Sequence, residues 1–380
     1  MSFKGLSKYT REDTQKSILI KDILKSQEVS YKCLYSRGEE LCDQIAYADE
    51  APSKYCPECG REYPESENFC FECLVSLKDI RKVNVKDIEM NPVFEVVKSH
   101  DLNSFDEIFT DENLDKLNNF NFDYAQLSEI KNNIKRIAFK RLDEAIKGSG
   151  IFFDNLSILD KITLFTKSFV NLDYKSYGHE LGYFEVNRIC IDDRQLPAFQ
   201  ITTMLHELAH FLIKEVLTHI LCEVLDSRKT SEIESIAIFI LSSSPVNQLI
   251  DEYCAHTVEG RFTLFGYQDY SSYLNIEKTI DAPSDEIEMI KTIGNSFASH
   301  IKNILESFIG DDLLGDIKTQ FRIDVLDEPN YENLLLENCM LLNEKGMIQA
   351  IRMILVEGFN TSMENVDKLN DYRRCLEMKK

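Results

Sequence analysis

Apolar residues recur every three or four positions along most of the chain, a spacing that predicts α-helices. In the segment 124–147 they fall on one helix face, and Gly148 and Gly150 mark the expected helix end. Ser104, followed by two acidic residues, has the form of a helix start. Pro197 suits the first turn of a later helix. Further helices are expected at 1–50, 156–170, 231–241, 246–262, 284–309, 331–342, 347–357 and 361–377.

A strand pattern appears just before the helix that Pro197 opens. Between residues 182 and 192, apolar residues alternate at Phe184 and Val186 and again at Ile189 and Ile191, with an interruption between the two pairs. This predicts a short hairpin whose strand carries an irregularity. The expected fold class is therefore mainly α, of the α+β kind, with a short β-hairpin or sheet.

Changes in these patterns divide the chain into five regions. We expect a helical N-terminal segment at 1–53, a metal-binding segment at 54–76, a helical linker at 77–150, a central region at 151–280, and a helical C-terminal region at 281–380 that packs on the central one. A length of 380 residues is consistent with two or three domains.

The charge balance bears on partners and location. The formal net charge of −22 makes nucleic acid an unlikely partner, because phosphate backbones are also negative. The N-terminus lacks the apolar stretch of a signal peptide, and the longest apolar run, 236–241, is too short to span a bilayer. We expect a cytoplasmic protein with no membrane partner; the oligomeric state stays open.

Four of the eleven cysteines form two closely spaced pairs, Cys56 with Cys59 and Cys70 with Cys73. Each C-x-x-C unit can present two thiolates to one ion, and four thiolates form a closed tetrahedral Zn²⁺ site. A redox pair is the weaker alternative, because two units occur together. The segment resembles short zinc-ribbon modules, which implies a structural zinc and a docking or spacing role.

The candidate chemistry lies in His206-Glu207-Leu208-Ala209-His210, an H-E-x-x-H pattern in an apolar stretch. Histidines four positions apart lie on one face of a helix and can bind a single Zn²⁺. Glu207 points away from that face and can reach a water on the metal. The alternative is a buried helix that happens to carry two histidines.

A catalytic zinc takes three protein ligands and leaves a position open. The segment 246–262 offers the third, because Glu252, His256 and Glu259 share one helix face. Glu252 is the preferred ligand. His256 and Glu259 remain alternatives, either as metal ligands or as groups that contact the ligands. Asp251 is the remaining carboxylate that could serve as a ligand.

His206-Glu207-x-x-His210 followed by Glu252-x-x-Ala255 resembles the zincin metallopeptidases of the Glu-zincin type, and is loosely similar to ImmA/IrrE-type bacterial metallopeptidases. Asp or Asn commonly follows the alanine in the latter, whereas this chain has His256. The similarity covers about 170–275. It implies a zincin-like catalytic domain at 151–280, with one catalytic Zn²⁺ beside the structural one.

The resemblance also implies roles. Zinc on His206, His210 and Glu252 would activate water, and Glu207 would act as general base and proton donor. His256 is a candidate catalytic residue, as a donor to the oxyanion; Tyr253 and the aromatic segment 265–273 are alternatives. The edge strand of the hairpin at 182–192 could pair with an extended peptide, or could simply cover the helix.

The function expected from the sequence is a zinc-dependent metallopeptidase that hydrolyses peptide bonds of a specific intracellular protein. The alternative is a non-catalytic zinc-binding regulatory or scaffold protein with a zincin-like fold. A third option is a nucleic-acid-linked role of the zinc ribbon.

Overall fold

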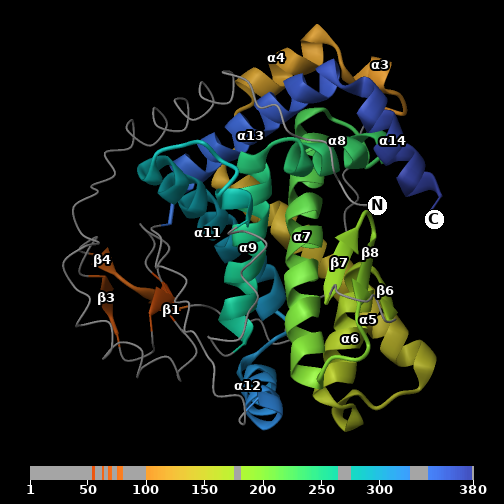
Figure 1. Ribbon diagram of the computed structural model, residues 1–380, viewed down its shortest axis with the longest axis vertical. Helices are drawn as coiled ribbons and strands as arrows, with labels where there is room; N and C mark the ends of the chain where they lie inside the picture. Colours follow the sequence, from red (N-terminus) through yellow and green to blue (C-terminus); the bar gives the residue numbers. More distant parts are fainter. Residues whose placement is uncertain are drawn as a thin grey trace.

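The computed structural model describes residues 54–55, 62–63, 67–70, 75–79, 100–174, 181–263, 275–325 and 341–378. This part of the chain is mainly helical and has few strands (Figure 1), which confirms the expected class at that level. The helix expected at 1–50 and residues 331–340 of the helix expected at 331–342 lie outside the described residues, as does the aromatic segment 265–273; residues 341 and 342 are not helical.

The helices before the central region begin at the residues that local capping favours. Helices α3 (Phe105–Ile108) and α4 (Asp111–Asn119) begin after Ser104 and Thr110, whose hydroxyls accept a backbone N–H of the first turn. Helix α5 (Tyr124–Ser149) begins with a capping box between Asp123 and Gln126 and ends at Gly150, which has a left-handed φ of 66°. The predicted end of this helix is confirmed.

Helix α6 (Ile158–Phe169), which follows the short 3₁₀ turn η2 (Phe153–Asn155), leads into a three-stranded sheet. Strands β7 (Gly182–Glu185) and β8 (Arg188–Ile191) are antiparallel, and β6 (Asn171–Tyr174) runs parallel to β8, so the order is β6-β8-β7. A short hairpin before α7 is present as expected, but the single irregular strand expected over 182–192 is wrong, because this run forms two strands. The interruption in the alternation is the two-residue turn at Val186 and Asn187, in which Val186 has a φ of 59°.

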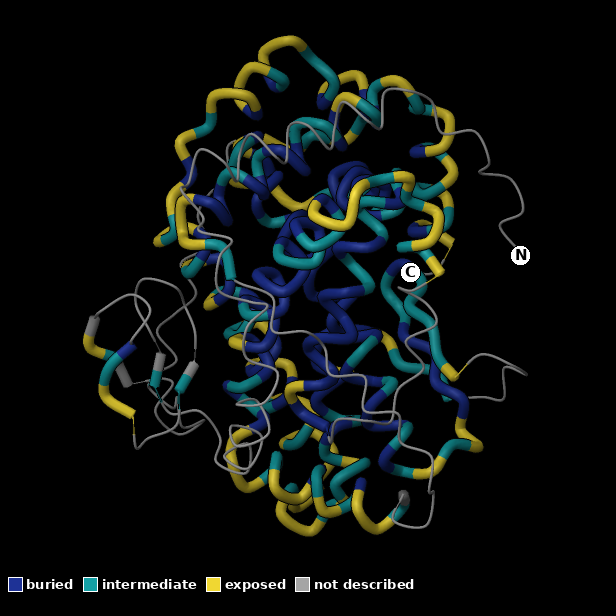
Figure 2. Tube along the Cα trace, turned by 60° about the vertical axis from the view of Figure 1, so that its left-hand side comes forward, coloured by how far each residue is buried: buried dark blue, intermediate teal, exposed yellow. Residues whose placement is uncertain are grey.

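Helix α7 (Pro197–Val224) lies at the centre of the molecule, between α9 on one side and the hairpin on the other (Figure 1). It is succeeded by α8 (Ser231–Ser242) and α9 (Pro245–Phe262), and both α7 and α9 carry the predicted proline in the first turn. The middle of α7 is buried almost all round, as the dark tube in Figure 2 shows. A helix that is apolar all round is expected to be the core of the fold.

The C-terminal helices differ from the prediction in two places. They are α11 (Ser284–Glu306), α12 (Asp311–Val325), α13 (Glu344–Glu364) and α14 (Val366–Glu377). No helix was expected at 311–325; its buried Phe321 packs against Phe199 at the start of α7, a tertiary contact that local spacing does not reveal. The break between the last two helices lies at Asn365, later than the predicted 357–361.

A continuous hydrophobic core runs from Phe105 in α3 to Leu369 in α14. It therefore crosses the boundaries expected near 150 and 280. Among the described helices, none is by itself long and apolar enough to cross a membrane; α8 and α9 together meet that test but are bent by 93°.

The expected zinc ribbon is described only in fragments. Two small sheets are present, one of order β2-β1-β5 and one that pairs β3 with β4. Their strands are β1 (Lys54–Tyr55), β2 (Glu62–Tyr63), β3 (Phe69–Cys70), β4 (Val75–Ser76) and β5 (Lys78–Asp79). Cys70 is buried, and its Sγ accepts a hydrogen bond from Tyr63 Oη at 3.0 Å. Cys56, Cys59 and Cys73 lie outside the described residues.

Candidate metal centre

Two neighbouring helices supply the candidate site. His206 and His210 lie one turn apart on α7, and their Nε2 atoms are 3.2 Å apart. Apolar residues such as Leu205, Leu208 and Ala209 are fully buried around them, so α7 cannot rotate this face into solvent. The two imidazoles therefore stay directed at α9.

Helix α9 meets these imidazoles with Glu252. Its Oε2 lies 3.7 Å from His206 Nε2, and its Oε1 lies 3.9 Å from His210 Nε2. Ala255, on the same face of α9 and fully buried, leaves room for the two helices to approach. The predicted set of His206, His210 and Glu252 is thus brought together from two helices.

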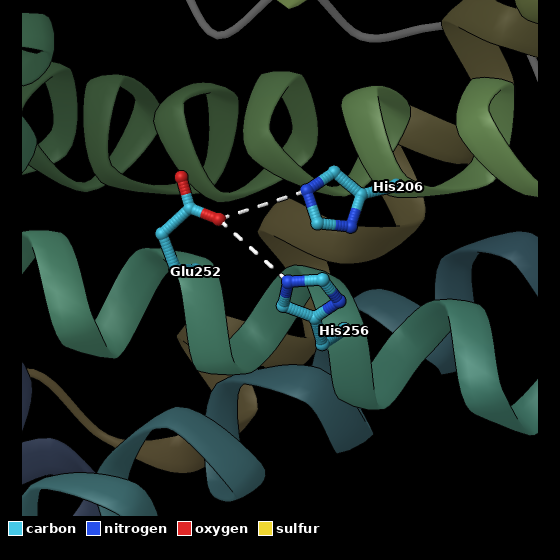
Figure 3. Close-up of side chains that lie close together, drawn as sticks. All are labelled: His206, Glu252 and His256. Atoms are coloured by element: carbon cyan, nitrogen blue, oxygen red, sulfur yellow. Dashed lines mark ion pairs between the residues drawn. The ribbon is translucent and has the colours of Figure 1, made fainter. Parts of the chain in front are cut away.

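His256, one turn further along α9, joins the same group (Figure 3). Its Nε2 lies 4.0 Å from Glu252 Oε2. His206, Glu252 and His256 each offer one ligand atom, and these three atoms lie within 4.8 Å of one another. The sequence suggested His256 both as an alternative ligand and as a catalytic residue; in the structure its Nε2 lies among the candidate ligand atoms.

Carboxylates stand behind the three imidazoles. Glu259 Oε2 lies 3.1 Å from His206 Nδ1 and 3.4 Å from His256 Nδ1, and Asp251 Oδ2 lies 3.0 Å from His210 Nδ1. A carboxylate at Nδ1 keeps the proton there and leaves the Nε2 lone pair for a metal. The sequence left the roles of Asp251 and Glu259 open, because spacing alone does not show which histidine each one meets.

The arrangement fits a zinc ion by three observations. Ligands about 2.0–2.1 Å from a tetrahedral zinc are about 3.4 Å apart, close to the 3.2–3.9 Å found among His206, His210 and Glu252. Glu252 Oε2 is buried, and within the described part of the chain it has no hydrogen-bond partner. Imidazole and carboxylate are ligands that zinc accepts.

The electrostatics of the group also favour a cation. Burial lowers the pKa of His206, but Glu252 and Glu259 outweigh burial and hold this pKa well above its usual value. Burial likewise lowers the pKa of His210, but Asp251 and Glu252 raise it to about 9. Burial raises the pKa of Glu252, yet His206 and His210 more than offset it and lower this pKa. The buried carboxylates thus stabilise positive charge at the imidazoles, where a metal ion would also be stabilised.

Glu207 lies on the same turn of α7 as the histidines. It is buried, and burial raises the pKa of its carboxyl above the usual value, although His206 and His210 oppose the shift. A carboxylate whose pKa is shifted toward neutrality is suited to accept and return a proton.

The hairpin approaches α7 one turn before His206. A Cβ added to Gly182 would lie 2.3 Å from Thr203 Cγ2, so only glycine lets β7 lie this close to the helix. Strand β7 is at the edge of its sheet, because β8 occupies the centre.

A separate cleft of about 840 Å³ lies beside another face of α7. Phe211, Glu215 and His219 line it, whereas His206, His210, Glu252 and His256 do not. The group of candidate ligands is thus a separate, largely buried cluster between α7 and α9 that does not line this cleft.

Comparisons with protein families, with curated proteins and with solved structures found no match for this chain. A function for the site must therefore be argued from its own geometry.

Proposed function

We propose that this chain is a zinc-dependent metallopeptidase of the H-E-x-x-H type. The observation that carries the proposal is the convergence of His206, His210 and Glu252 from two helices, with Asp251 and Glu259 behind the imidazoles. In this proposal the three residues hold the catalytic zinc. When bound there, zinc supplies a Lewis acid that lowers the pKa of water and polarises a carbonyl.

The protein's own groups perform the proton transfers. Glu207 takes a proton from the attacking water and later delivers it to the leaving amine. Its burial supports this role, because a carboxyl with a raised pKa holds the proton between the two steps. Asp251 and Glu259 keep His210 and His206 oriented, so that the ligand atoms do not turn away.

The proposed substrate is a protein or peptide in the cytoplasm. The edge of β7 is the place where an extended peptide can add as a further strand, because its main-chain groups face outward from the sheet there. The charge of −22 disfavours nucleic acid as a partner. Cys56, Cys59, Cys70 and Cys73 are proposed to hold a second, structural zinc.

The first prediction concerns Glu207. We expect Glu207→Gln to keep the metal and the fold and to lower peptide cleavage by at least about a hundredfold, because the general base is lost. Cleavage of a quenched fluorescent peptide library, together with zinc content and circular dichroism, measures this. Glu223→Gln, on the same helix but away from the group, serves as the matched control.

If Glu207→Gln cleaves the library as fast as the parent protein does, the peptidase proposal is wrong. If the parent binds zinc at this site but cleaves no peptide, the result favours the second candidate function, which is a non-catalytic zinc-binding regulatory or scaffold protein. One observation favours that second candidate, namely the position of His256 Nε2 only 4.0 Å from Glu252. A fourth ligand would close the site, as in structural zinc centres.

A further inference from the structure

His256 faces the same point as the two histidines of α7, although it belongs to α9. Its ring centroid lies 4.5 Å from that of His206, and its side chain is only 5% exposed. In Figure 3 Glu252 lies to one side of the two rings, and the dashed lines run from its carboxylate to one nitrogen of each. The two helices therefore direct three imidazoles and one carboxylate into one small space.

Glu259 lies beside both His206 and His256. One oxygen, Oε2, lies 3.1 Å from His206 Nδ1 and 3.4 Å from His256 Nδ1, and the contact with His206 is a hydrogen bond. At His206 this carboxylate favours the tautomer with the proton on Nδ1, which leaves a lone pair on Nε2. The Nε2 atoms of His206 and His256 lie 3.7 and 4.0 Å from the same oxygen of Glu252, Oε2.

The distances around Glu252 do not separate His256 from the other two histidines. The Nε2 atoms of His206 and His256 lie 3.7 and 4.0 Å from Oε2, and the Nε2 atom of His210 lies 3.9 Å from Oε1. An ion that His206 and Glu252 share is therefore within reach of His256.

We propose that His256 is a fourth protein ligand of this metal ion, so that three imidazoles and one carboxylate hold it. The inference rests on the metal site of the proposed function but does not depend on peptide cleavage. It differs from the three-ligand set of the peptidase proposal, because His256 occupies the position that a catalytic zinc leaves open. A reactant gains access when His256 leaves the ion or when the ion accepts a fifth ligand.

The test uses His256→Asn in the full-length chain. An asparagine amide keeps a polar group beside Glu259, but it offers no lone pair in the place of Nε2. His256→Ala is the second variant, in case the first folds poorly. The matched control is His219→Asn, because His219 lies on α7, lines the separate cleft and is remote from the group.

The probe is Co²⁺, added to each metal-free protein and followed by visible absorption and by competition with a chelator. Any Co²⁺ bound by the cysteines contributes equally to parent and variants and cancels in the difference. We expect His256→Asn and His256→Ala to bind the ion of this site at least about tenfold more weakly, and to lose the intense absorption of four-coordinate Co²⁺. His219→Asn should match the parent in both respects.

An affinity within about twofold of the parent, with an unchanged spectrum, would overturn the inference. The two proposals fail separately. A parent protein that shows the four-ligand spectrum but cleaves no peptide refutes the peptidase proposal and leaves His256 as a ligand. A parent that cleaves peptides, with His256→Asn unchanged in Co²⁺ binding, refutes only the role of His256.

Discussion

Lys214 and Glu215 lie on α7 one turn beyond the candidate metal ligands and form a second buried polar group. Lys214 Nζ lies 2.7 Å from Glu215 Oε1 and 3.0 Å from Asn187 Oδ1, and the Lys214 side chain is fully buried. Lys229 reaches Glu215 at 2.7 Å and Glu234 at 2.8 Å. Each buried charge is thus paired, which is the condition for tolerating it in the core.

Glu215 leads to a prediction about pH. Burial raises its pKa, but Lys214 and Lys229 outweigh burial and lower the pKa to about 2. An unfolded glutamate titrates near 4.3, so between that pH and about 2 the unfolded chain binds more protons at this residue than the folded chain does. The contribution of Glu215 to stability is therefore fully present above pH ~4.5 and is lost as the pH falls toward about 2.

The measurement is urea unfolding of the parent and of Glu215→Gln across this range. The parent should be more stable by about 2–4 kcal/mol at pH ~5, and the difference should shrink as the pH falls. Glu112→Gln is the control, because Glu112 pairs with Lys116 on an exposed surface of α4 and its loss should matter little. A parent-to-variant difference that does not change with pH would contradict the assignment.

At the scale of elements, close approach between helices depends on individual glycines. Gly358 in α13 faces Ile240 in α8, and a Cβ added there would lie 2.3 Å from Ile240 Cγ1 and 3.0 Å from its Cβ. Ile240 is fully buried and cannot move aside easily. The helix pair therefore depends on the missing side chain at this position.

We expect Gly358→Ala to lower the free energy of unfolding by about 1–3 kcal/mol, because the added methyl group overpacks the α8–α13 contact. Gly315→Ala is the matched control on α12, where a Cβ would meet nothing within 4 Å. It should raise stability by about 0.5–1 kcal/mol, the ordinary gain of alanine over glycine in a helix. Chemical denaturation measures the free energy of unfolding of both variants. If Gly358→Ala and Gly315→Ala change this free energy equally, the α8–α13 contact accommodates the added methyl group without cost.

At the scale of the whole molecule, the candidate metal centre joins two core helices that are separate in the sequence. Helices α7 and α9 both contribute to the continuous core, and Asp251, Glu252 and Glu259 bring three carboxylates to their interface with the three histidines. A bound cation would stabilise this interface, because it binds the folded chain and has no preformed site in the unfolded one.

Removal of zinc should therefore lower the melting temperature of the protein. With zinc at a hundred times its dissociation constant, the expected stabilisation is about 2.7 kcal/mol. In Glu252→Gln, the rise in melting temperature that zinc causes through this site should be lost. In Cys70→Ala, the rise that zinc causes through the cysteines should be lost. Calorimetry with and without zinc separates the two. A Glu252→Gln protein with the full zinc response of the parent would contradict the assignment of Glu252 as a ligand.

Local spacing was sufficient to predict most of the described helices, the hairpin, and the shared helix face of His206 and His210. These features depend on contacts within one or two turns of chain, on capping residues such as Ser104 and Gly150, and on the alternation along a strand. Helix α12 was not predicted, because it depends on a contact between residues that are distant in sequence: Phe321 is buried against Phe199.

The composition of the site depended on how α7 and α9 pack. Periodicity places Asp251, Glu252, His256 and Glu259 on one helix, but the rotation and separation of two helices determine which atom each side chain meets. Packing brought Glu252 and Glu259 to His206 and Asp251 to His210, whereas His256 meets Glu252 and Glu259 within α9, at the i,i+4 and i,i+3 spacings. The pattern of residues specified the two helices and the candidate residues on them, and the contact between the helices specified which of these residues meet across the interface, because the rotation and separation of packed helices depend on residues distant in sequence.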